Sequence, residues 1–335
     1  MRAWWVERPG PVQGSPLQLG ERDDPVPGPG EVRLQISCCG ICRTDLHLAE
    51  GDLAPRRPGV VPGHEVVGYV DALGPGAWRF AVGDRVGVAW LRWTCGRCRF
   101  CRRGSENLCL APLFTGWDAD GGYAERCLVD ERFAYRVPAG YDDEHAAALL
   151  CSGIIGYRAL RLAGLPPAGR LGIYGFGASA HLTAQLALRQ GARVHVLTRS
   201  SAAQRLAVDL GVTSAAGAAN APPEPLDAAI LFAPVGDLVP VALRALERGG
   251  TLAVAGIHLS DIPTLDYAAD LFQERVLRSV TANTRRDGEE LLALAGALGL
   301  RVVTTPYPFE RAQDALTDLA EDRVDGAAVL TVDQP

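Results

Sequence analysis

Four closely spaced cysteines form the part of the sequence with the clearest chemical use. They are Cys95, Cys98, Cys101 and Cys109, a C-x2-C-x2-C-x7-C run. Four thiolates at this spacing can surround one tetrahedral zinc ion at about 2.3 Å each, and the arginines between them offset the negative charge. The alternatives are free thiols or an iron–sulfur cluster, whose known cysteine runs have different spacing. We predict a structural zinc, which has no open ligand position and therefore stabilises a lobe without doing chemistry.

A second set of possible metal ligands and proton carriers lies nearer the N-terminus. It consists of Cys42-Arg43-Thr44-Asp45-Leu46-His47 and Gly63-His64-Glu65. Thiolate and imidazole groups bind zinc, and hydroxyl and imidazole groups can pass protons. Neither stretch is specific by itself, because a histidine after a glycine is more often structural than a ligand. The two stretches gain weight only in combination with the other motifs.

A glycine-rich turn indicates a nucleotide site. Gly175-Phe176-Gly177-Ala178-Ser179-Ala180 has the form G-x-G-x-x-A, between a strand-like run at 169–174 and a helix-like run at 178–190. In this fingerprint the glycines permit a tight turn, and the helix N-terminus binds a pyrophosphate. Gly175, Gly177, Ala178 and Ser179 are therefore candidate cofactor contacts. The alternative is a plain strand-to-helix turn, which the surrounding motifs make less attractive.

The elements that must hold these residues change in character along the chain. Up to about residue 140, short alternating or glycine-broken apolar runs predict an irregular all-β domain. From about residue 142, strands and helices alternate, which predicts a parallel, doubly wound sheet. Its strands are expected at 169–174, 194–198, 228–232 and 251–256. After about residue 286 we expect the tail to return to the first domain.

The amino-acid composition limits the classes of protein to which the chain can belong. The 335 residues favour two domains, and the formal charge of −6 gives no basic footprint for nucleic acid. All 33 basic residues are arginine, which excludes a Schiff-base or Walker lysine. We find no apolar run near the roughly 18 residues of a membrane span and no signal peptide, so we expect a cytoplasmic protein without membrane or nucleic-acid partners. Nine cysteines there indicate metal binding or catalysis before disulfides.

Together these motifs resemble the zinc-containing medium-chain alcohol dehydrogenase family over nearly the whole chain. The resemblance rests on residues 40–47, on Gly63-His64-Glu65, on the four-cysteine run and on Leu149-Leu150-Cys151-Ser152-Gly153. It implies an α/β chain in which a GroES-like β-rich catalytic domain is joined to a doubly wound Rossmann dinucleotide-binding domain. We expect the catalytic domain at 1–148 and 286–335, its structural zinc lobe at 93–110, and the Rossmann domain at 149–285. A homodimer or homotetramer is also implied.

The resemblance assigns a catalytic zinc to Cys42, His64 and Cys151, in addition to the structural one, so two zinc ions are expected per chain. The fourth position stays open for water or an alcohol, whose bound oxygen the metal makes more acidic. Asp45 is expected to hydrogen-bond His64. Glu65 resembles the acidic neighbour that approaches the metal during ligand exchange, and Thr44 and His47 resemble a proton relay. Cys38, Cys39 and Cys127 are interpreted as small buried hydrophobic residues.

Cofactor preference depends on the end of the second strand of the Rossmann domain. NAD enzymes usually carry an acidic residue there, whereas this chain has Thr198-Arg199-Ser200. These groups can bind a 2′-phosphate, so NADP(H) is favoured over NAD(H); alternatively, Arg199 is a solvated arginine beside the adenosine of NAD. Arg43 resembles the family's pyrophosphate-binding arginine. The family's second arginine is replaced by Ala327, and Ile155 replaces a polar nicotinamide contact.

The substrate is expected to be a small, primary alcohol or aldehyde. Trp90 resembles the family's pocket wall, and Trp117 and Tyr123 are further candidates, although aromatic residues more often pack in the core. A polyol or cinnamyl-type alcohol dehydrogenase of the same fold remains an alternative. A zinc-free quinone reductase would lack Cys42 and the cysteine run. A non-enzymatic zinc-binding module would lack the glycine turn. Asn283 and Arg285 are candidates for positions near the nicotinamide or the cleft.

Overall fold

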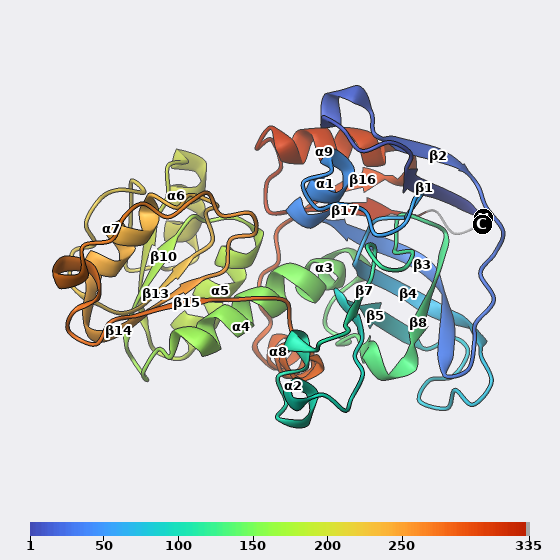
Figure 1. Cartoon of the computed structure of the whole chain (residues 1–335), viewed down its shortest axis with the longest axis horizontal. Coiled ribbons are helices and arrows are strands. Elements are labelled where there is room, and N and C mark those ends of the chain that lie inside the picture. Colours follow the sequence, from blue (N-terminus) through green and yellow to red (C-terminus); the bar gives the residue numbers. More distant parts are fainter. Residues whose placement is uncertain (333–335) are drawn as a thin grey trace. The chain divides into compact units, whose positions relative to one another are not determined.

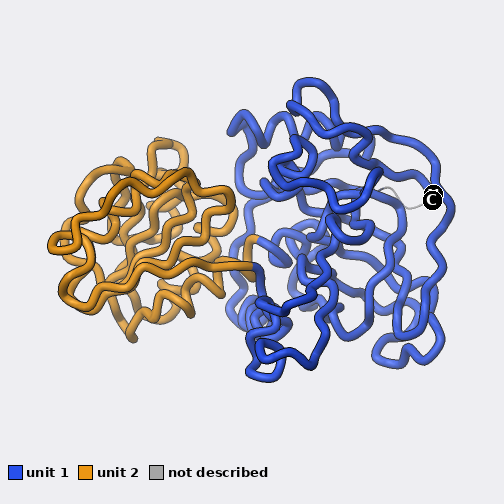
Figure 2. The backbone as a smooth tube through the Cα atoms, in the orientation of Figure 1, with its two compact units in different colours: residues 1–151, 282–335 blue, residues 152–281 orange. Residues whose placement is uncertain are grey.

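The computed structural model describes residues 1–332, and the chain divides into two compact units that we describe separately. Unit 1 comprises Met1–Cys151 and Ala282–Pro335, and unit 2 comprises Ser152–Thr281 (Figure 2). Our expected boundaries at 149 and 285 lie a few residues away from these. Residues 149–151 and 282–285 belong to unit 1 because they contact it: Leu150 packs on Gly87, and Asn283 hydrogen-bonds Tyr135.

A seven-stranded sheet forms the body of unit 1 (Figure 1). Its strands lie in the order β16 (Thr304–Pro308), β17 (Ala327–Thr331), β3 (Glu31–Ile41), β4 (Glu65–Leu73), β5 (Arg85–Val88) and β9 (Ala134–Arg136), and β8 (Arg126–Asp130) also pairs with β3. The first pair, β16 and β17, is parallel and the other pairs are antiparallel. Because β17 pairs with β3, the C-terminal segment completes this sheet.

The register between β3 and β4 brings two distant parts of the sequence together. Gly40 lies opposite Glu65, and Cys39 lies opposite Val66. The end of β3 therefore lies beside the start of β4. Cys42 directly follows β3 and His64 directly precedes β4, so both come to the same corner of the sheet. Along most of β3, residues alternate between buried and half-buried, which fixes this register because a slip of one residue would reverse the faces.

Smaller elements complete unit 1. Strand β1 (Arg2–Val6) pairs with β2 (Leu17–Glu21), and β6 (Leu91–Trp93) pairs with β7 (Leu113–Phe114). The helices are α1 (Arg43–Glu50), α2 (Arg99–Arg102), α3 (Asp143–Ala148), α8 (Arg285–Leu298) and α9 (Ala312–Ala320). Buried aliphatic side chains of β3 and β4, with Phe309 and Leu316 from the tail, form its main core. Burial of this apolar surface stabilises the unit.

Unit 2 is a parallel sheet with helices between its strands. The strand order is β12 (Ser214–Ala216), β11 (Arg193–Leu197), β10 (Arg170–Tyr174), β13 (Leu226–Leu231), β14 (Leu246–Val254) and β15 (Val276–Ser279). The helices are α4 (Ile154–Ala163), α5 (Ala178–Arg189), α6 (Ser201–Asp209) and α7 (Leu238–Ala245). All five strand pairs are parallel, and the order reverses next to β10, which is the doubly wound dinucleotide-binding arrangement.

One apolar stretch differs from our expectation. We predicted that no run would approach the length of a membrane span, and this was wrong for Asp143–Ala163, which is 21 residues long and sufficiently apolar. We did not predict one continuous helix here, but in the structure α3, a π-helical turn and α4 follow one another without a break. In the structure, 67% of an 18-residue apolar window of this stretch is buried inside the protein, as in the core helix of a globular fold.

Candidate active site and zinc centres

Four possible metal ligands meet in unit 1 at the corner formed by β3 and β4. The ligand atoms of Cys42, His64, Glu65 and Cys151 all lie within 4.8 Å of one another. Cys42 Sγ is 3.3 Å from His64 Nε2, and Cys151 comes from the π-helical turn Leu149–Gly153 after α3. Two thiols and one imidazole are a donor set that zinc prefers. The structure thus brings together the three residues predicted as ligands and adds a carboxylate.

The local fold around Cys42 explains its orientation. Cys42 is the N-cap of α1, and its Sγ accepts the N–H of Thr44 at 3.3 Å. In return, Asp45 Oδ2 accepts the N–H of Cys42 at 3.0 Å, which completes a capping box. Helix N-termini leave backbone N–H groups without partners, and this exchange satisfies two of them. The same positive helix end favours a thiolate at Cys42.

Asp45 also connects α1 to the loop that carries His64. Its Oδ1 accepts the N–H of Gly63 at 3.0 Å and lies 3.4 Å from His64 Nδ1, an ion-pair distance rather than a well-formed hydrogen bond. Gly63 has φ +94, and a Cβ there would lie 2.5 Å from Tyr123, so only glycine fits. Asp45 and His64 are 2% and 0% exposed. The imidazole is therefore held with Nε2 directed at the thiols.

Burial and charge at this corner suit a cation. A hydrogen bond from Cys151 and the neighbouring His64 hold the pKa of the Cys42 thiol well below its usual range. Burial raises the pKa of Glu65 well above its usual range, with the negative charge of Cys42 adding to the effect. Glu65 Oε1 is buried and has no hydrogen-bond partner among the described residues. Such an atom next to a thiolate fits a zinc site, since a metal would supply the missing positive charge.

The predicted proton carriers lie on α1. Thr44 and His47 are three residues apart on this helix and therefore share a face. His47 Nδ1 is 2.9 Å from Asp52 Oδ2, and the two side chains are 15% and 52% exposed. The N–H groups of Gly51 and Leu53 both donate to the carbonyl of His47, so the turn after α1 holds Asp52 beside the imidazole. Sequence analysis missed Asp52, although its place in a Gly-Asp turn just after the helix was a weak signal.

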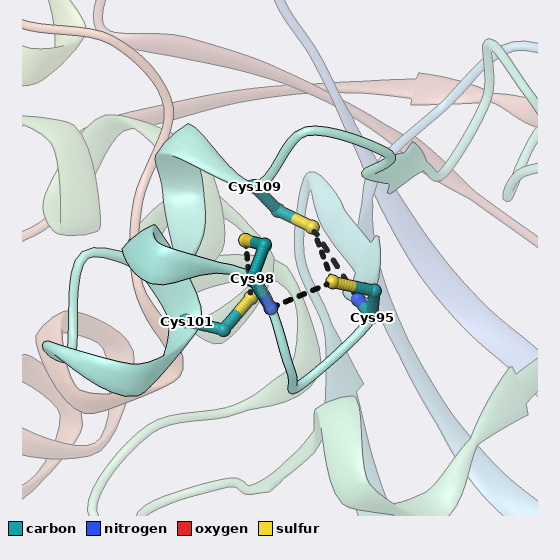
Figure 3. Close-up of side chains that lie close together, drawn as sticks. All are labelled: Cys95, Cys98, Cys101 and Cys109. Carbon is teal, nitrogen blue, oxygen red and sulfur yellow. Dashed lines mark hydrogen bonds between the residues drawn. The ribbon is translucent and has the colours of Figure 1, made fainter.

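The four cysteines of the predicted structural site also converge, as Figure 3 shows. Their Sγ atoms lie within 4.8 Å of one another, with 3.5 Å from Cys98 to Cys101 and 3.5 Å from Cys95 to Cys109. Backbone N–H groups of Cys98 and Ala111 donate to sulfur atoms of the cluster at 3.4 Å. Backbone hydrogen bonds lower the pKa of Cys98 to about 6, which favours the thiolate. Four converging sulfurs leave no position for a substrate.

An aromatic cluster lies beside the candidate catalytic ligands. The ring of Trp90 packs edge-on against His64 at 4.9 Å between centroids. It stacks on Phe114 at 5.0 Å and on Trp117 at 6.0 Å. Trp90 and Trp117 are half-buried, whereas Tyr123 is 0% exposed within the main core. The interpretation of Tyr123 as a pocket residue was therefore wrong, because it fills the space that Gly63 leaves open, and Phe114 is the aromatic residue that the sequence did not reveal.

The glycine turn lies in unit 2 between β10 and α5. Gly175 has φ +85, and a Cβ there would come within 2.8 Å of Ala233 N, so the turn requires glycine. Gly177 is the N-cap of α5, which begins at Ala178 and has no acidic residue in its first turn. Ser179 therefore lies in the first turn of a helix whose free N–H groups and dipole suit an anion.

The end of β11 carries the residues predicted to read the cofactor ribose. Leu197 ends the strand, and the N–H of Thr198 still pairs with Ala216. The hydroxyl of Ser200 accepts the N–H of Ala203 at 3.3 Å and so caps α6. Arg199 lies between these two residues on the exposed surface.

Three other predicted contacts have their partners within unit 1. Arg43 Nη2 is 2.5 Å from Asp322 Oδ1. Asn283 is 2% exposed and donates to Tyr135 and to the Thr284 carbonyl. Arg285 is paired with Glu106 and its guanidinium lies over the Phe133 ring.

Cys38, Cys39 and Cys127 are buried, and burial raises the pKa of each thiol, which suits a packing role.

A β-rich unit with two clusters of possible zinc ligands and a unit with a doubly wound parallel sheet are the architecture of zinc-containing, dinucleotide-dependent dehydrogenases. Comparisons with known proteins agree. Residues 28–139 match the alcohol dehydrogenase GroES-like domain. A Mycobacterium tuberculosis protein named as a probable alcohol dehydrogenase is 57% identical, over 99% of this chain and 97% of its own. A Geobacillus stearothermophilus alcohol dehydrogenase is 32% identical, over 95% and 97%.

Solved structures lead to the same family. A Sorghum bicolor cinnamyl alcohol dehydrogenase has a TM-score of 0.88 and 26% identity, and the match covers 98% of this chain and 97% of that one. The chain therefore belongs to the medium-chain alcohol dehydrogenase family and is an oxidoreductase. The predicted fold class, a GroES-like catalytic domain with a Rossmann domain, is confirmed, and so is the predicted alcohol dehydrogenase activity.

Proposed function

We propose that this enzyme transfers hydride between a primary alcohol or its aldehyde and NADP(H), with a catalytic zinc at Cys42, His64 and Cys151. The observation that carries the proposal is the convergence of two thiols and one imidazole from three separate segments within 4.8 Å. Zinc bound there would make an alcohol oxygen more acidic and stabilise the alkoxide. Cys95, Cys98, Cys101 and Cys109 are proposed to hold a second, structural zinc.

The chain's own residues account for the proton. Asp45 fixes the imidazole of His64, and buried Glu65 is poised beside the ligands. Thr44 is proposed to take the alcohol proton at its hydroxyl and pass it towards His47. Asp52 accepts a hydrogen bond from His47 Nδ1, which fixes the orientation of the imidazole. The exposed carboxylate of Asp52 then connects the relay to water.

The metal assignment is tested by metal content. Wild type is expected to hold two zinc ions per chain, and His64→Ala is expected to hold one and to lose turnover. A His64→Ala variant with full activity would contradict the zinc mechanism. One zinc in the wild type, together with no dinucleotide binding, would favour a non-enzymatic zinc-binding module.

The preference for NADP(H) rests on charge. Thr198 replaces the acidic residue that would repel a 2′-phosphate, and Arg199 offers it a cation. Ser200 already uses its hydroxyl to cap α6, so Arg199 is the stronger determinant. Gly175, Gly177, Ala178 and Ser179 are proposed to hold the pyrophosphate, because the free N–H groups of a helix N-terminus suit an anion. A Sinorhizobium meliloti protein named as a putative zinc-binding dehydrogenase and bound to NADP, 26% identical with a TM-score of 0.89, supports the proposal.

Fluorescence titration with NADPH and NADH tests this preference. Arg199→Ala is expected to weaken NADPH binding about tenfold and NADH binding little, because it removes one charged phosphate contact. Arg189→Ala, an exposed arginine at the far end of α5, is the matched control. Tighter binding of NADH by the wild type would contradict the proposal.

The substrate is proposed to lie against Trp90 and Trp117. The stacked rings beside His64 narrow this side of the site, which suits slender primary alcohols. A cinnamyl-type substrate is the second candidate, because flat conjugated alcohols stack on such rings and an Arabidopsis thaliana cinnamyl alcohol dehydrogenase is 31% identical. A panel of aliphatic, aryl and polyol substrates with both cofactors separates these possibilities.

The cellular setting and the assembly also remain proposals. We propose a cytoplasmic enzyme that works as a homodimer or homotetramer, without nucleic-acid or membrane partners. The formal charge of −6 and the burial of the apolar stretch Asp143–Ala163 support this. Light scattering of the purified chain gives the assembly state.

A further inference from the structure

An ion pair joins the four-cysteine lobe to the start of α8, far along the sequence. Glu106 lies inside the lobe, between Cys101 and Cys109, and Arg285 is the first residue of α8. Arg285 Nε lies 3.0 Å from Glu106 Oε1, and Nη2 lies 2.7 Å from Oε2. The backbone N–H of Arg285 also donates to Oε1 at 2.8 Å. One carboxylate thus receives both arms of a guanidinium and the first N–H of a helix, a geometry with little freedom.

This pair differs from an ordinary surface ion pair in its burial. The Glu106 side chain is 11% exposed and that of Arg285 36% exposed. The next residue on the same helix, Arg286, pairs with Glu290 but is 75% exposed. Exposed pairs of that kind contribute little to stability. A buried carboxylate, by contrast, must keep its partner, because the loss of either side leaves a charge without compensation.

The guanidinium of Arg285 also contacts the aromatic cluster through Phe133. Its central carbon lies 4.5 Å from the centre of the Phe133 ring, within the range of a cation–π contact. Phe133 is 2% exposed and packs with Leu91 and Phe114 in one small core, against which Trp90 and Trp117 are also packed. Phe114 stacks on Trp90, and Trp90 packs against His64.

These contacts form a continuous packed path within unit 1. It runs from Glu106 to Arg285 and Phe133, through the small core that Phe133 forms with Leu91 and Phe114, and from Phe114 to Trp90. Packed interiors transmit displacement because they contain few voids. The lobe is therefore connected to the wall of the candidate alcohol pocket and not only to its own metal cluster.

We propose that Glu106 and Arg285 are positioning residues for alcohol binding, which hold Phe133 and thereby the aromatic wall at Trp90 in place. This rests on the proposed function, in which Trp90 lines the alcohol site. In this role the four-cysteine lobe does more than stabilise the protein, because it carries Glu106. We call the Glu106–Arg285 pair the clamp. A merely structural pair would lower the melting temperature when broken and leave the alcohol KM unchanged.

The test compares Arg285→Lys with Arg286→Lys in the full-length, zinc-loaded enzyme. Lysine keeps the charge but loses the two-armed contact with Glu106 and the planar guanidinium over the Phe133 ring. We expect the KM for benzyl alcohol and for 1-butanol to rise about fivefold or more in Arg285→Lys, as contacts of this size suggest. The KM for the dinucleotide and kcat are expected to change less than twofold. Arg286→Lys is expected to match the wild type in all four quantities.

Glu106→Gln provides a second variant that keeps the shape of the side chain. If Arg285→Lys melts below the assay temperature, the same comparison is made with Glu106→Gln. The double variant is expected to raise the alcohol KM no further than Arg285→Lys alone, because both changes break one contact. A lowered melting temperature with an unchanged alcohol KM would overturn the inference. A wild type that binds dinucleotide but turns over no alcohol would instead contradict the proposed function.

Discussion

Replacing Asp45 with asparagine tests the candidate catalytic site. The two oxygens of this buried carboxylate accept hydrogen bonds from two different segments. Oδ2 accepts the N–H of Cys42 at 3.0 Å. Oδ1 accepts the N–H of Gly63 at 3.0 Å and lies 3.4 Å from His64 Nδ1. Asparagine has one acceptor oxygen, so its NH2 group must face one of these N–H donors. The change is nearly isosteric, and Asp45 is only 2% exposed, so water cannot replace the lost acceptor.

The size of the effect follows from these contacts. A buried donor without an acceptor costs about 1–3 kcal/mol, so the free energy of unfolding of the metal-free protein is expected to fall by that amount. Loss of the carboxylate behind a metal-binding histidine lowers metal affinity about 10- to 100-fold. That corresponds to about 1.4–2.7 kcal/mol of binding free energy at 25 °C. Asp45 accepts its hydrogen bonds from Cys42 and Gly63, outside the four-cysteine lobe, so the zinc affinity of the lobe is expected to stay unchanged.

Competition with a chromophoric chelator gives the affinity of each zinc, and the lobe serves as an internal reference. Urea unfolding of the metal-free protein gives its free energy of unfolding. Asp120→Asn is the matched control, since Asp120 also accepts a backbone N–H, that of Val61 at 2.9 Å, but its side chain is 36% exposed. If Asp45→Asn binds both zinc ions as tightly as Asp120→Asn, the inference that Asp45 positions His64 is refuted.

Three further predictions concern the pocket wall, the lobe and the clamp. Trp90→Ala should improve kcat/KM for branched alcohols roughly tenfold relative to ethanol; an unchanged substrate series would remove Trp90 from the pocket. Cys98→Ser should lower the melting temperature before turnover is lost, because a closed metal site contributes to folding; unchanged melting would argue against zinc there. Burial alone would raise the pKa of Glu106, but hydrogen bonds from Arg285 hold it below its usual range. A lowered pKa contributes stability above the unfolded value of about 4.3 and loses it as the pH falls through the folded pKa, so wild type and Glu106→Gln should differ most near pH 7 and converge in acid; a constant difference would contradict this.

The candidate metal ligands were predictable because local chemistry restricts the residue types at these positions. Cys42 is followed by a capping residue, Asp45, and His64 lies between a left-handed glycine and a buried strand. The four-cysteine spacing is likewise a local pattern. Such positions tolerate few residue types, so a motif a few residues long identifies them. The parallel sheet was predictable for a similar reason, since strands and helices alternate in the sequence.

The partners that come from remote segments were not predictable. Glu106 meets Arg285 across 179 positions, and no period or spacing relates them. The interpretation of Tyr123 failed because an aromatic residue near glycines suits a pocket and a core equally well. The Tyr123 ring packs where a side chain at Gly63 would lie, a contact that the sequence does not reveal. The π-helical turn that carries Cys151 was also not predictable, because apolar spacing alone does not distinguish it from α-helix.

The candidate site therefore depends on strand pairing more than on any helix. Cys42 and His64 meet because Gly40 lies opposite Glu65, and a shift of one residue between β3 and β4 would send alternate side chains to the opposite face. Strand β17 pairs along β3 up to Ile41, next to Cys42, so the last strand of the chain supports the segment that carries the first ligand. The clamp at Arg285 is contributed by the same returning segment. Residues 282–332 thus act on both sides of the site without supplying a ligand, which explains why motifs in the first half of the chain identify the chemistry but not what holds it in place.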